Sequence, residues 1–491
     1  MTSQLQNRRR RTTVRSAVSW LAFAASAVAH RVVPVGFSKA NVPAGNLVRR
    51  ASFSATLINE KTAYFAKVQV GTPPQTVTLH IDTGSSDLWL LSDNTDLCNS
   101  NVLQEQWGQC VDTFNQDASS TFEVVGDGDF SIRYVDETGA SGDYFTDNVK
   151  IGDGQTITGL QMGLAHESTS NWGMLGIGMP GALSAEEPYP NIIDLMYEQG
   201  LIATKAYSLY LDDYDAETGQ ILFGGLDTEK FHGTLTTVPL VGHNISGQIF
   251  YDHFTVPLTS ITAVGSGQNS SFFSTPDARQ DPLYVILDSG TSLTYLPASI
   301  TSRLYSLLDA VDDSTGFRAT GQVYVDCNKR RQSGLSLSFQ FNGPSGPIIN
   351  VPASELIIDD LKPYIAQGFR LPSKLPWPDE RVCRLGIMTA DHEPPYLVGD
   401  TFLRSAYVVY DLTNHAVAMA QSNIYSDKSN IIEIPAGGTI PTVTGAAFVP
   451  RPTDETDEDE DNAGVGRTTK GMGGMAVGVA AIVGAMTLFG F

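Results

Sequence analysis

Cysteine is scarce in this chain, and the motifs of several common enzyme classes are missing from it. The 491 residues include four cysteines and eight histidines, and neither a C-x-x-C nor an H-E-x-x-H spacing occurs, so the usual zinc sites have no support. The glycine-rich stretches lack the lysine of a phosphate-binding loop, and Gly173–Gly176 lacks the serine of a nucleophile elbow. We therefore expect neither a metal ion nor another cofactor.

Positive charge is also scarce. The chain has 31 Lys and Arg against 53 Asp and Glu, which gives a formal net charge of -22. Both ends depart from this trend, because residues 1–50 carry nine basic residues and residues 463–491 carry two, with no acidic residue in either range. The part between them is therefore strongly acidic, and such a surface repels nucleic acid. We expect no nucleic-acid partner.

Two short segments, Ile81–Ser86 and Leu287–Ser292, spell nearly the same sequence 206 residues apart. In each, an aspartate at the end of an apolar run is followed by a hydroxyl residue, a glycine and two more hydroxyl residues. This repetition suggests a duplicated lobe that contributes one carboxylate, Asp82 or Asp288, to a shared site. Two carboxylates held together cannot both ionise easily, so one keeps a proton and acts as acid while the other acts as base. Such a pair can activate water against an amide.

These and other segments resemble the pepsin-like aspartic proteases, and most closely the fungal yapsin-type members that carry a glycosylphosphatidylinositol (GPI) anchor. The resemblance runs from about Thr62 to Gln421. Besides the two aspartate segments, it rests on a tryptophan, a flap-like segment and an apolar-apolar-glycine element in each half: Trp89, Ser131–Tyr134, Met174–Gly176 and Leu397–Gly399.

The resemblance implies an all-β, bilobal fold with the active-site cleft between two related β lobes. We place the N-terminal lobe at 51–212 and the C-terminal lobe at 213–430, because the sequence around Asp212 resembles the strands that join the lobes in the family. Residues 77–81 agree with this fold, since apolar and polar side chains alternate there as in a half-buried strand. Helical patterning is limited to short stretches, for example 192–199 and 300–310.

By resemblance, Asp82 and Asp288 are the catalytic pair and share one proton and one water. Gly84 and Gly290 would let the backbone approach the carboxylates, where any Cβ would intrude. Thr83 and Ser289 would brace the two loops across the lobes. Ser85 and Thr291 would bond the outer carboxylate oxygens. Tyr134 of the flap would pair with the indole of Trp89. An ordinary core tyrosine on a strand is the alternative for Tyr134.

The flap departs from the family pattern after Tyr134. The family usually has a glycine there, whereas this chain has Val135, whose branched side chain should restrict the turn. Asp136 and Glu137 follow, in the part of the flap that by resemblance leans over the substrate. Carboxylates in a partly desolvated pocket attract Lys or Arg, which predicts cleavage beside basic residues. The alternative is that both merely solvate an exposed turn. The full predicted substrate-binding set is Tyr134, Gly84, Gly290, Thr291, Asp136 and Glu137.

The four cysteines permit three pairings. We choose Cys98–Cys110 and Cys327–Cys383, because each loop then stays inside one lobe and the secretory route is oxidising. Glycosylation sequons begin at Asn244 and Asn269, and they matter only if the chain is secreted.

The N-terminus has the layout of a secretory signal peptide over residues 1–29. Basic residues precede an apolar stretch and a small-x-small cleavage site at Ala27–Ala29. The alternative is a cytosolic basic tail before a buried helix. By resemblance, residues 30–50 form a propeptide that ends at a dibasic pair and leaves Ala51 as the mature N-terminus. Its positive charge would suit it to lie across an acidic cleft until the carboxylates protonate.

Residues 431–462 lose the β pattern and end in a dense acidic run, which predicts a disordered stalk because like charges repel and cannot be buried. Small residues, a mostly polar spacer and an apolar tail follow. This is the order of a GPI-attachment signal, so we expect 463–491 to be removed and Asn462 to carry the anchor, with Gly464 as second choice. A transmembrane helix is the alternative, and it would normally be followed by Lys or Arg.

These features together predict a monomeric aspartic endopeptidase of the secretory pathway and cell surface, held at the plasma membrane or cell wall by its lipid anchor. It would hydrolyse protein or peptide substrates, with an acidic pH optimum. The alternative from another class is a wall-anchored binding or structural protein that kept the fold and lost the chemistry. The presence of both aspartates, with their hydroxyl and glycine neighbours, favours the enzyme.

Overall fold

The computed structural model describes residues 33–39 and 63–448, apart from 153, 217, 266–268, 276–280, 317–318, 332–333, 359–360, 362–364, 366–368 and 392. The predicted signal peptide, the acidic run, Asn462 and residues 463–491 lie outside the described residues. Within the described part, no helix is both long enough and apolar enough to cross a membrane.

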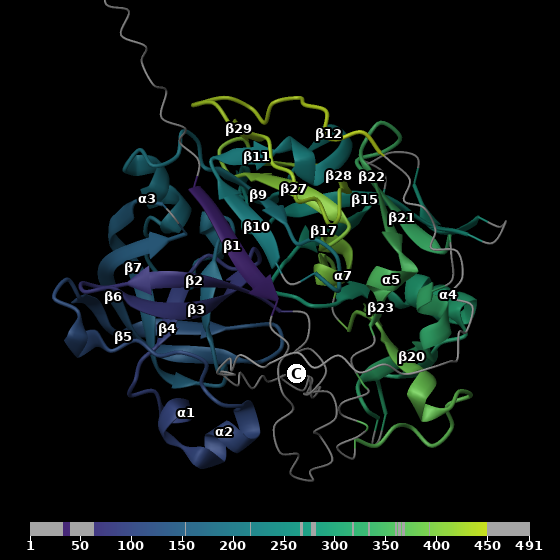
Figure 1. Ribbon diagram of the computed structural model, residues 1–491, viewed down its shortest axis with the longest axis horizontal. Coiled ribbons are helices and arrows are strands. Elements are labelled where there is room, and N and C mark those ends of the chain that lie inside the picture. Colours follow the sequence, from purple (N-terminus) through teal and green to yellow (C-terminus); the bar gives the residue numbers. More distant parts are fainter. Residues whose placement is uncertain are drawn as a thin grey trace, which may run out of the picture. The chain divides into compact units, whose positions relative to one another are not determined.

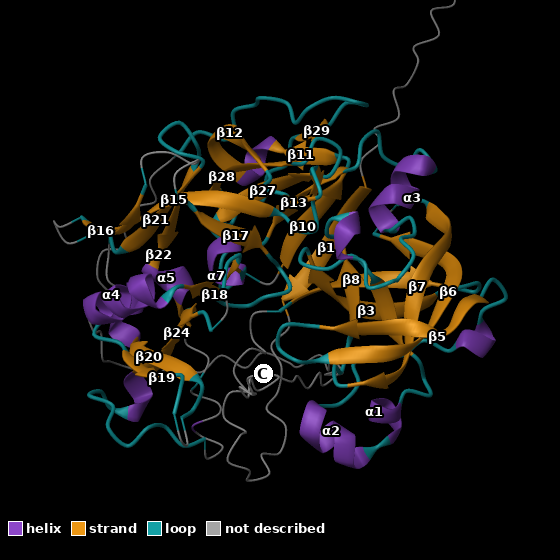
Figure 2. Cartoon of the chain, turned by 180° about the vertical axis from the view of Figure 1, so that it is seen from behind, coloured by secondary structure: helices purple, strands orange, loops and turns teal. Residues whose placement is uncertain are grey.

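Strands dominate the described part of the chain, and one sheet of 13 strands takes up most of the N-terminal half (Figure 2). Its strands from that half are β1 (Val33–Lys39), β2 (Tyr64–Val70), β3 (Gln75–Asp82), β4 (Leu88–Leu91), β5 (Glu123–Arg133), β6 (Gly139–Ile151), β7 (Thr156–Ser168), β8 (Gly173–Gly176), β9 (Ala206–Tyr210) and β10 (Thr218–Phe223). The C-terminal half adds β12 (Phe231–Pro239), β27 (Ala406–Asp411) and β28 (Ala416–Ser422). The strand order is β12-β28-β27-β9-β10-β1-β2-β3-β8-β4-β7-β6-β5.

The C-terminal half has an eight-stranded sheet of its own, in the order β22-β21-β15-β17-β26-β18-β25, with β16 on β15. Its strands are β15 (Thr255–Val264), β16 (Ser270–Ser274), β17 (Leu283–Leu287), β18 (Thr294–Leu296), β21 (Ser336–Phe341), β22 (Ile348–Pro352), β25 (Ile387–Thr389) and β26 (Tyr396–Val398). Smaller sheets join β19 (Val311–Asp313), β20 (Gln322–Asp326), β24 (Val382–Leu385) and β23 (Ile357–Ile358); β11 (Gly225–Asp227) and β29 (Ile431–Glu433); and β13 (His243–Ile245) and β14 (Gln248–Phe250).

The helices are short: α1 (Asp96–Asn99), α2 (Asn101–Trp107), α3 (Ile192–Glu198), α4 (Ala298–Leu308), α5 (Ala353–Leu356) and α7 (Asp400–Leu403). Two of them, α3 and α4, lie where the sequence predicted helices. The side chain of Asn191 begins α3 by accepting hydrogen bonds from two backbone N–H groups of the first turn, and Asp194 completes a capping box. Helix α4 follows Pro297 and ends at Leu308, before the capping residue Asp309, whose φ of 49° is left-handed.

The elements fall into two groups around the shared sheet. Figure 1 shows β2 to β7 on one side and α4, α5 and β20 on the other, with β9, β10 and β27 between them. The all-β, bilobal prediction is therefore confirmed. One local expectation needs refinement, because β3 is half-buried only at its start. His80 and Asp82 on its polar face are also buried, and both line the cleft.

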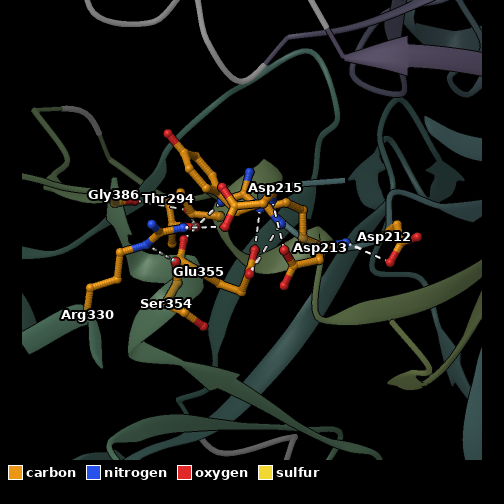
Figure 3. Close-up of polar contacts among 11 residues, drawn as sticks. Asp212, Asp213, Asp215, Thr294, Arg330, Ser354, Glu355 and Gly386 are labelled. Carbon is orange, nitrogen blue, oxygen red and sulfur yellow. Dashed lines mark hydrogen bonds and ion pairs between the residues drawn. The ribbon is translucent and has the colours of Figure 1, made fainter. Parts of the chain in front are cut away.

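The turn between β9 and β10, where the sequence places the lobe boundary near Asp212, is tied to the C-terminal half. Glu355 of α5 and Arg404, at the end of α7, are both buried and form an ion pair at 2.5 Å. Glu355 also accepts the backbone N–H of Tyr214 at 3.3 Å. The guanidinium groups of Arg330 and Arg404 lie 4.8 and 5.2 Å from the centre of the Tyr214 ring. Figure 3 shows this cluster around Glu355, which fixes the connection between the two lobes.

Residues 431–448, which the sequence analysis assigned to the disordered stalk, are folded. Strand β29 pairs with β11, and Thr444 and Ala446 form isolated bridges to β12. Ile434 and Ile440 are buried in an apolar cluster with side chains of the shared sheet. The predicted start of the stalk at residue 431 is therefore corrected, because these apolar residues find a place on the C-terminal lobe at least as far as Phe448.

Strand β1 belongs to the predicted propeptide, residues 30–50. It pairs antiparallel with β10 on one side, where Val33 faces Phe223, and with β2 on the other, where Phe37 faces Ala66. The part of the predicted propeptide that the structure describes is therefore an inner strand of the shared sheet rather than a segment lying across the cleft.

Candidate active site

Asp82 and Asp288 stand at the ends of two similar strand pairs. Asp82 is the last residue of β3, which runs parallel to β8, and Asp288 directly follows β17, which runs parallel to β26. The carbonyl oxygen of Asp82 accepts the N–H of Ile177 at 2.8 Å, and the N–H of Asp288 donates to the carbonyl of Val398 at 3.1 Å. The strands that carry the two apolar-apolar-glycine elements thus each run parallel to a strand that leads into an aspartate, and a backbone hydrogen bond links each aspartate to its neighbouring strand or the residue after it.

Thr83 and Ser289 join the two aspartate loops across the lobes. Thr83 Oγ1 donates to the carbonyl of Leu287 at 2.9 Å and accepts the backbone N–H of Ser289 at 2.9 Å. Ser289 Oγ donates to the carbonyl of Ile81 at 3.1 Å and accepts the backbone N–H of Thr83 at 3.2 Å. Both hydroxyl residues are fully buried. This reciprocal set of hydrogen bonds, the "cross-lobe frame", holds the two loops at a fixed separation.

Each carboxylate receives one backbone N–H and one hydroxyl from its own loop. The donors are, for Asp82, Gly84 N (2.7 Å) and Ser85 Oγ, and for Asp288, Gly290 N (2.8 Å) and Thr291 Oγ1 (2.5 Å). These bonds fix the orientation of the carboxyl planes, and they leave the arrangement symmetric between the lobes.

The two glycines also make room for the opposite carboxylate. A Cβ on Gly84 would lie 2.7 Å from Asp288 Oδ1, and a Cβ on Gly290 would come still closer to Asp82 Oδ1. Real side chains do not make such short contacts, so any other residue would push the carboxylates away from each other's loops. The sequence predicted this close approach from the repeated glycine.

Burial raises the pKa of Asp82 above the usual range of a carboxyl, and the negative charge of Asp288 raises it further. Hydrogen bonds from Ser85 and Gly84 lower it, because they stabilise the charged form. Asp82 and Asp288 are only 4% and 8% exposed, so burial dominates. The pair therefore keeps a proton at a pH at which an exposed carboxyl has lost it.

The hairpin of β5 and β6 carries Tyr134 into the same cleft. Its hydroxyl accepts the indole N–H of Trp89 at 2.7 Å, which is the flap contact that the resemblance implied. Tyr134 also begins the tip turn, where Glu137 N–H donates to its carbonyl at 3.0 Å. The left-handed backbone of this turn falls on Glu137, with a φ of 67°, and not on Val135. The turn therefore tolerates the β-branched residue.

Asp136 and Glu137 have different surroundings. Asp136 lines the cleft, and its Oδ1 accepts the N–H and the hydroxyl of Thr138 at 3.0 and 2.6 Å. Glu137 is not among the described residues that line the cleft, and it pairs at 3.8 Å with Arg133, which does line it. Of the two carboxylates predicted to bind basic side chains, only Asp136 faces the substrate space.

The site lies in a cleft of about 470 Å³. Of the predicted residues, those that line it are Asp82, Gly84, Ser85, Tyr134, Asp136, Asp288, Gly290 and Thr291, whereas Thr83, Trp89 and Ser289 support it from behind. Sequence reasoning missed other lining residues, among them His80, Trp172, His253 and Tyr295. His80 could have been found from its place two residues before Asp82 on a strand.

Asp87 is a further residue that sequence reasoning missed. It is fully buried and accepts hydrogen bonds from Tyr189 OH (2.6 Å), Tyr144 OH (3.2 Å) and the backbone N–H of Ser184 (2.7 Å). Ser184 lines the cleft, so Asp87 positions one of its walls. The available signal was an acidic residue directly before the apolar run Leu88–Leu91.

The predicted disulfides are both present. Cys98 and Cys110 have an S–S distance of 2.10 Å and Cα atoms 5.4 Å apart. Cys327 and Cys383 have an S–S distance of 2.04 Å and Cα atoms 5.0 Å apart. Each closes a loop within one lobe, as expected. Asn244 and Asn269 are exposed, so both sequons are accessible to a glycosylating enzyme.

The chemistry of this arrangement is that of water activation between two carboxyl groups that share a proton. One group can take a proton from water while the other supplies a proton to the departing atom. The fold and the site together define a two-lobed aspartic hydrolase.

Comparison with known proteins agrees with this class. The family model "Eukaryotic aspartyl protease" matches residues 63–422, so the chain belongs to the eukaryotic aspartyl protease family. It is 38% identical over 427 residues to a probable aspartic-type endopeptidase opsB of Aspergillus oryzae, which covers 86% of this chain and 80% of that protein. It is 30% identical over 465 residues to Aspartic proteinase 3 of Saccharomyces cerevisiae, covering 80% and 75% of the two chains.

A solved structure supports the fold separately. The crystal structure of aspartic proteinase from Irpex lacteus matches with a TM-score of 0.56 at 22% identity, over 81% of this chain and 99% of that one. The chain is an aspartic-type endopeptidase, which confirms the predicted family and enzyme class.

Proposed function

We propose that Asp82 and Asp288 are the catalytic pair and that they hydrolyse peptide bonds by activating one water between them. The observation that carries this proposal is the cross-lobe frame, which brings two buried carboxyls from distant segments into one site. The ionised carboxyl removes a proton from water as it attacks the peptide carbonyl, and the protonated one stabilises the oxyanion and protonates the leaving nitrogen. Tyr134 covers the reacting groups.

The test is hydrolysis of a peptide library by the purified enzyme and by Asp82→Asn and Asp288→Asn. An amide cannot shuttle the proton, so each variant should lose hydrolysis while it keeps its melting temperature. Asp127→Asn, an exposed position on β5, is the matched control and should stay active. Statine-type inhibitors should block the enzyme, and chelators should not. Retained hydrolysis in either active-site variant refutes the assignment.

We also infer a preference for Lys or Arg beside the scissile bond, centred on Asp136. The pKa of Tyr295, another cleft residue, is raised to about 12, mainly by burial; the charge of Arg384 lowers it, and the charges of Asp136 and Asp391 contribute to the rise. Both carboxylates are thus near the same part of the cleft, where they favour a cationic side chain. Asp136→Ala should shift cleavage toward Leu and Phe, whereas Glu137→Ala serves as control. A hydrophobic preference in wild type and both variants contradicts the inference.

An acidic pH optimum belongs to the same proposal, because hydrolysis requires that the pair keep one shared proton. The pH–rate profile should fall on the alkaline side as this proton is lost. A rate that rises steadily to alkaline pH is inconsistent with the mechanism.

For the cellular route we propose a signal peptide at 1–29, a propeptide at 30–50, lobes at 51–212 and from 213 to at least 448, and a GPI anchor on Asn462 of a monomeric enzyme. The support is the sequence order of small residues, spacer and apolar tail. A phosphatidylinositol-specific phospholipase should release the native enzyme, and deletion of 463–491 should make it secreted. An intact tail in the mature protein, seen by mass spectrometry, rules the anchor out.

A further inference from the structure

His80 lies in the floor of the cleft, next to the proposed catalytic pair. It stands two residues before Asp82 on β3, so the two side chains leave the strand on the same face. The rise of a strand places their Cα atoms about 7 Å apart. His80 is 6% exposed, and it is one of the residues that line the cleft. A substrate side chain near the scissile bond would therefore meet it.

His80 is part of a row of side chains that crosses four strands. It is paired with Phe65 on β2 and with Met174 on β8, and Met174 is paired with Trp89 on β4. Paired residues project from the same face of a sheet, so the four side chains form one row. Trp89, at the end of the row, holds Tyr134 of the flap. The row therefore runs beneath the flap.

An aromatic wall borders His80 on one side. Its ring centre lies 5.3 Å from that of Phe65 and 5.8 Å from that of Trp172, and these two rings are 5.2 Å apart. Trp172 and Met174 line the cleft with His80. The result is an apolar, flat-sided pocket with an imidazole at its base, a shape that fits an aromatic ring.

The imidazole has hydrogen-bonding capacity to spare. Among the described residues, none forms a hydrogen bond with its ring nitrogens, and the neighbouring side chains of Phe65, Trp172 and Met174 include no charged group. Burial lowers the pKa of His80 to about 4, so above that pH the ring is neutral and offers one N–H donor and one acceptor.

We propose that His80 determines specificity at this pocket and selects tyrosine over phenylalanine, which has the same ring without the hydroxyl. The proposal rests on the function proposed above, since it needs the pocket to flank the catalytic pair. The substrate ring packs against Trp172 and Met174, and its hydroxyl bonds to the imidazole. Phenylalanine leaves a desolvated imidazole unpaired, which a site built for a hydrogen bond penalises. A bond between neutral groups corresponds to roughly a threefold to tenfold preference in kcat/KM.

The test uses pairs of peptides that differ only in Tyr or Phe, with the varied residue moved from four positions before the scissile bond to four after it. In the wild type, one position should favour Tyr by about threefold to tenfold. His80→Phe keeps a flat ring and removes both nitrogens, so the Tyr/Phe ratio at that position should fall to one or below. His253→Phe, which changes the other histidine lining the cleft, should leave the ratio at that position as it is.

A second measurement separates specificity from folding and from catalysis. His80→Gln keeps a hydrogen-bonding side chain and should retain part of the ratio, and inhibition constants of paired statine-type inhibitors should show the same ratio without turnover. A Tyr/Phe ratio that is equal in wild type and His80→Phe at every position overturns the proposal. Failure of the wild type to hydrolyse any peptide overturns the proposed function instead.

Discussion

At the scale of the residue, the site depends on what surrounds the two carboxyl groups. Both are buried, each receives one N–H and one hydroxyl, and each lies against the other loop's glycine. Burial raises the pKa of Asp82, with the charge of Asp288 adding to the effect. The same surroundings that prepare the pair for proton transfer also lower the free energy of unfolding once the shared proton is removed.

The raised pKa of Asp82 predicts that the free energy of unfolding depends on pH. Below the usual carboxyl pKa, both the folded and the unfolded states hold the Asp82 proton, and the carboxyl has no net effect. As pH rises toward the higher folded-state pKa, the unfolded state releases the proton first, so the free energy of unfolding falls. Asp82→Asn should therefore lose less stability between about pH 4 and neutrality than the wild type.

The measurement is urea unfolding at several pH values. Asp136→Asn removes one exposed carboxylate and serves as the control for net charge, so its slope should match the wild type. If the free energy of unfolding of Asp82→Asn and of the wild type falls equally with pH, the raised pKa of Asp82 does not cause the loss of stability.

Gly290 gives a second prediction at this scale. In Gly290→Ala the new methyl group would meet Asp82 Oδ1, and the carboxylates would have to separate. A displacement of about 1 Å at reacting groups costs on the order of 100-fold in rate, so kcat should fall by about that factor while the protein stays folded. Steady-state kinetics and a thermal melt check it, and a near-normal kcat would show that the contact can relax.

At the scale of the element, local sequence decided where secondary structure begins. Helix α3 starts at the asparagine cap just before its apolar positions, and α4 starts directly after Pro297. The flap turn is different. Its left-handed residue is Glu137 rather than the residue after Tyr134. Asp136 lines the cleft whereas Glu137 pairs with Arg133, a difference that the sequence did not predict.

The cap of α3 gives a prediction for this scale. Asn191 is buried and its side chain accepts from Ile193 N and Asp194 N, both at 3.0 Å. Asn191→Ala should lower the free energy of unfolding by about 1 kcal/mol, measured by urea titration. Asn101→Ala, at the exposed first position of α2, is the matched control and should change it little. Equal effects at both positions would show that the cap contributes nothing.

At the scale of the whole molecule, the lobes are joined by the cross-lobe frame and by shared strands, and the buried pair of Glu355 and Arg404 holds the turn between β9 and β10. Burial raises the pKa of Glu355, and the charge of Arg404 lowers it. Removing one partner would leave a buried charge unpaired and would lower the free energy of unfolding, but the intact pair adds little net stability because both groups lose their hydration. Both side chains of the pair contact Tyr214, so the pair fixes the path of the chain in the turn between β9 and β10.

Removing one partner should therefore cost more than removing both. Glu355→Gln or Arg404→Met alone should lower the free energy of unfolding by roughly 3–5 kcal/mol, and the double replacement by less than their sum. Lys329→Met breaks a pair whose carboxylate, Asp309, is 78% exposed, and should cost less than about 1 kcal/mol. A double-mutant cycle measures the coupling, and additive losses would contradict it.

The sequence by itself determined the duplicated design of this protein. The two aspartate segments predicted the paired carboxyls because both halves of the chain repeat the same pattern of aspartate, hydroxyl residue and glycine. The family pattern added the frame of Thr83 and Ser289 and the contact of Tyr134 with Trp89, all of which are present.

Tertiary structure alone decided what depends on register and packing. His80 faces the cleft because pairing with Phe65 and Met174 sets its row beneath the flap. Residues 431–448 fold because distant strands offer them an apolar surface, which composition could not reveal. Asp87 and Glu355 are buried because partners far along the chain satisfy them. A sequence states which groups are available, but only the three-dimensional contacts decide which of them lose water, and burial is what gives these groups their chemistry.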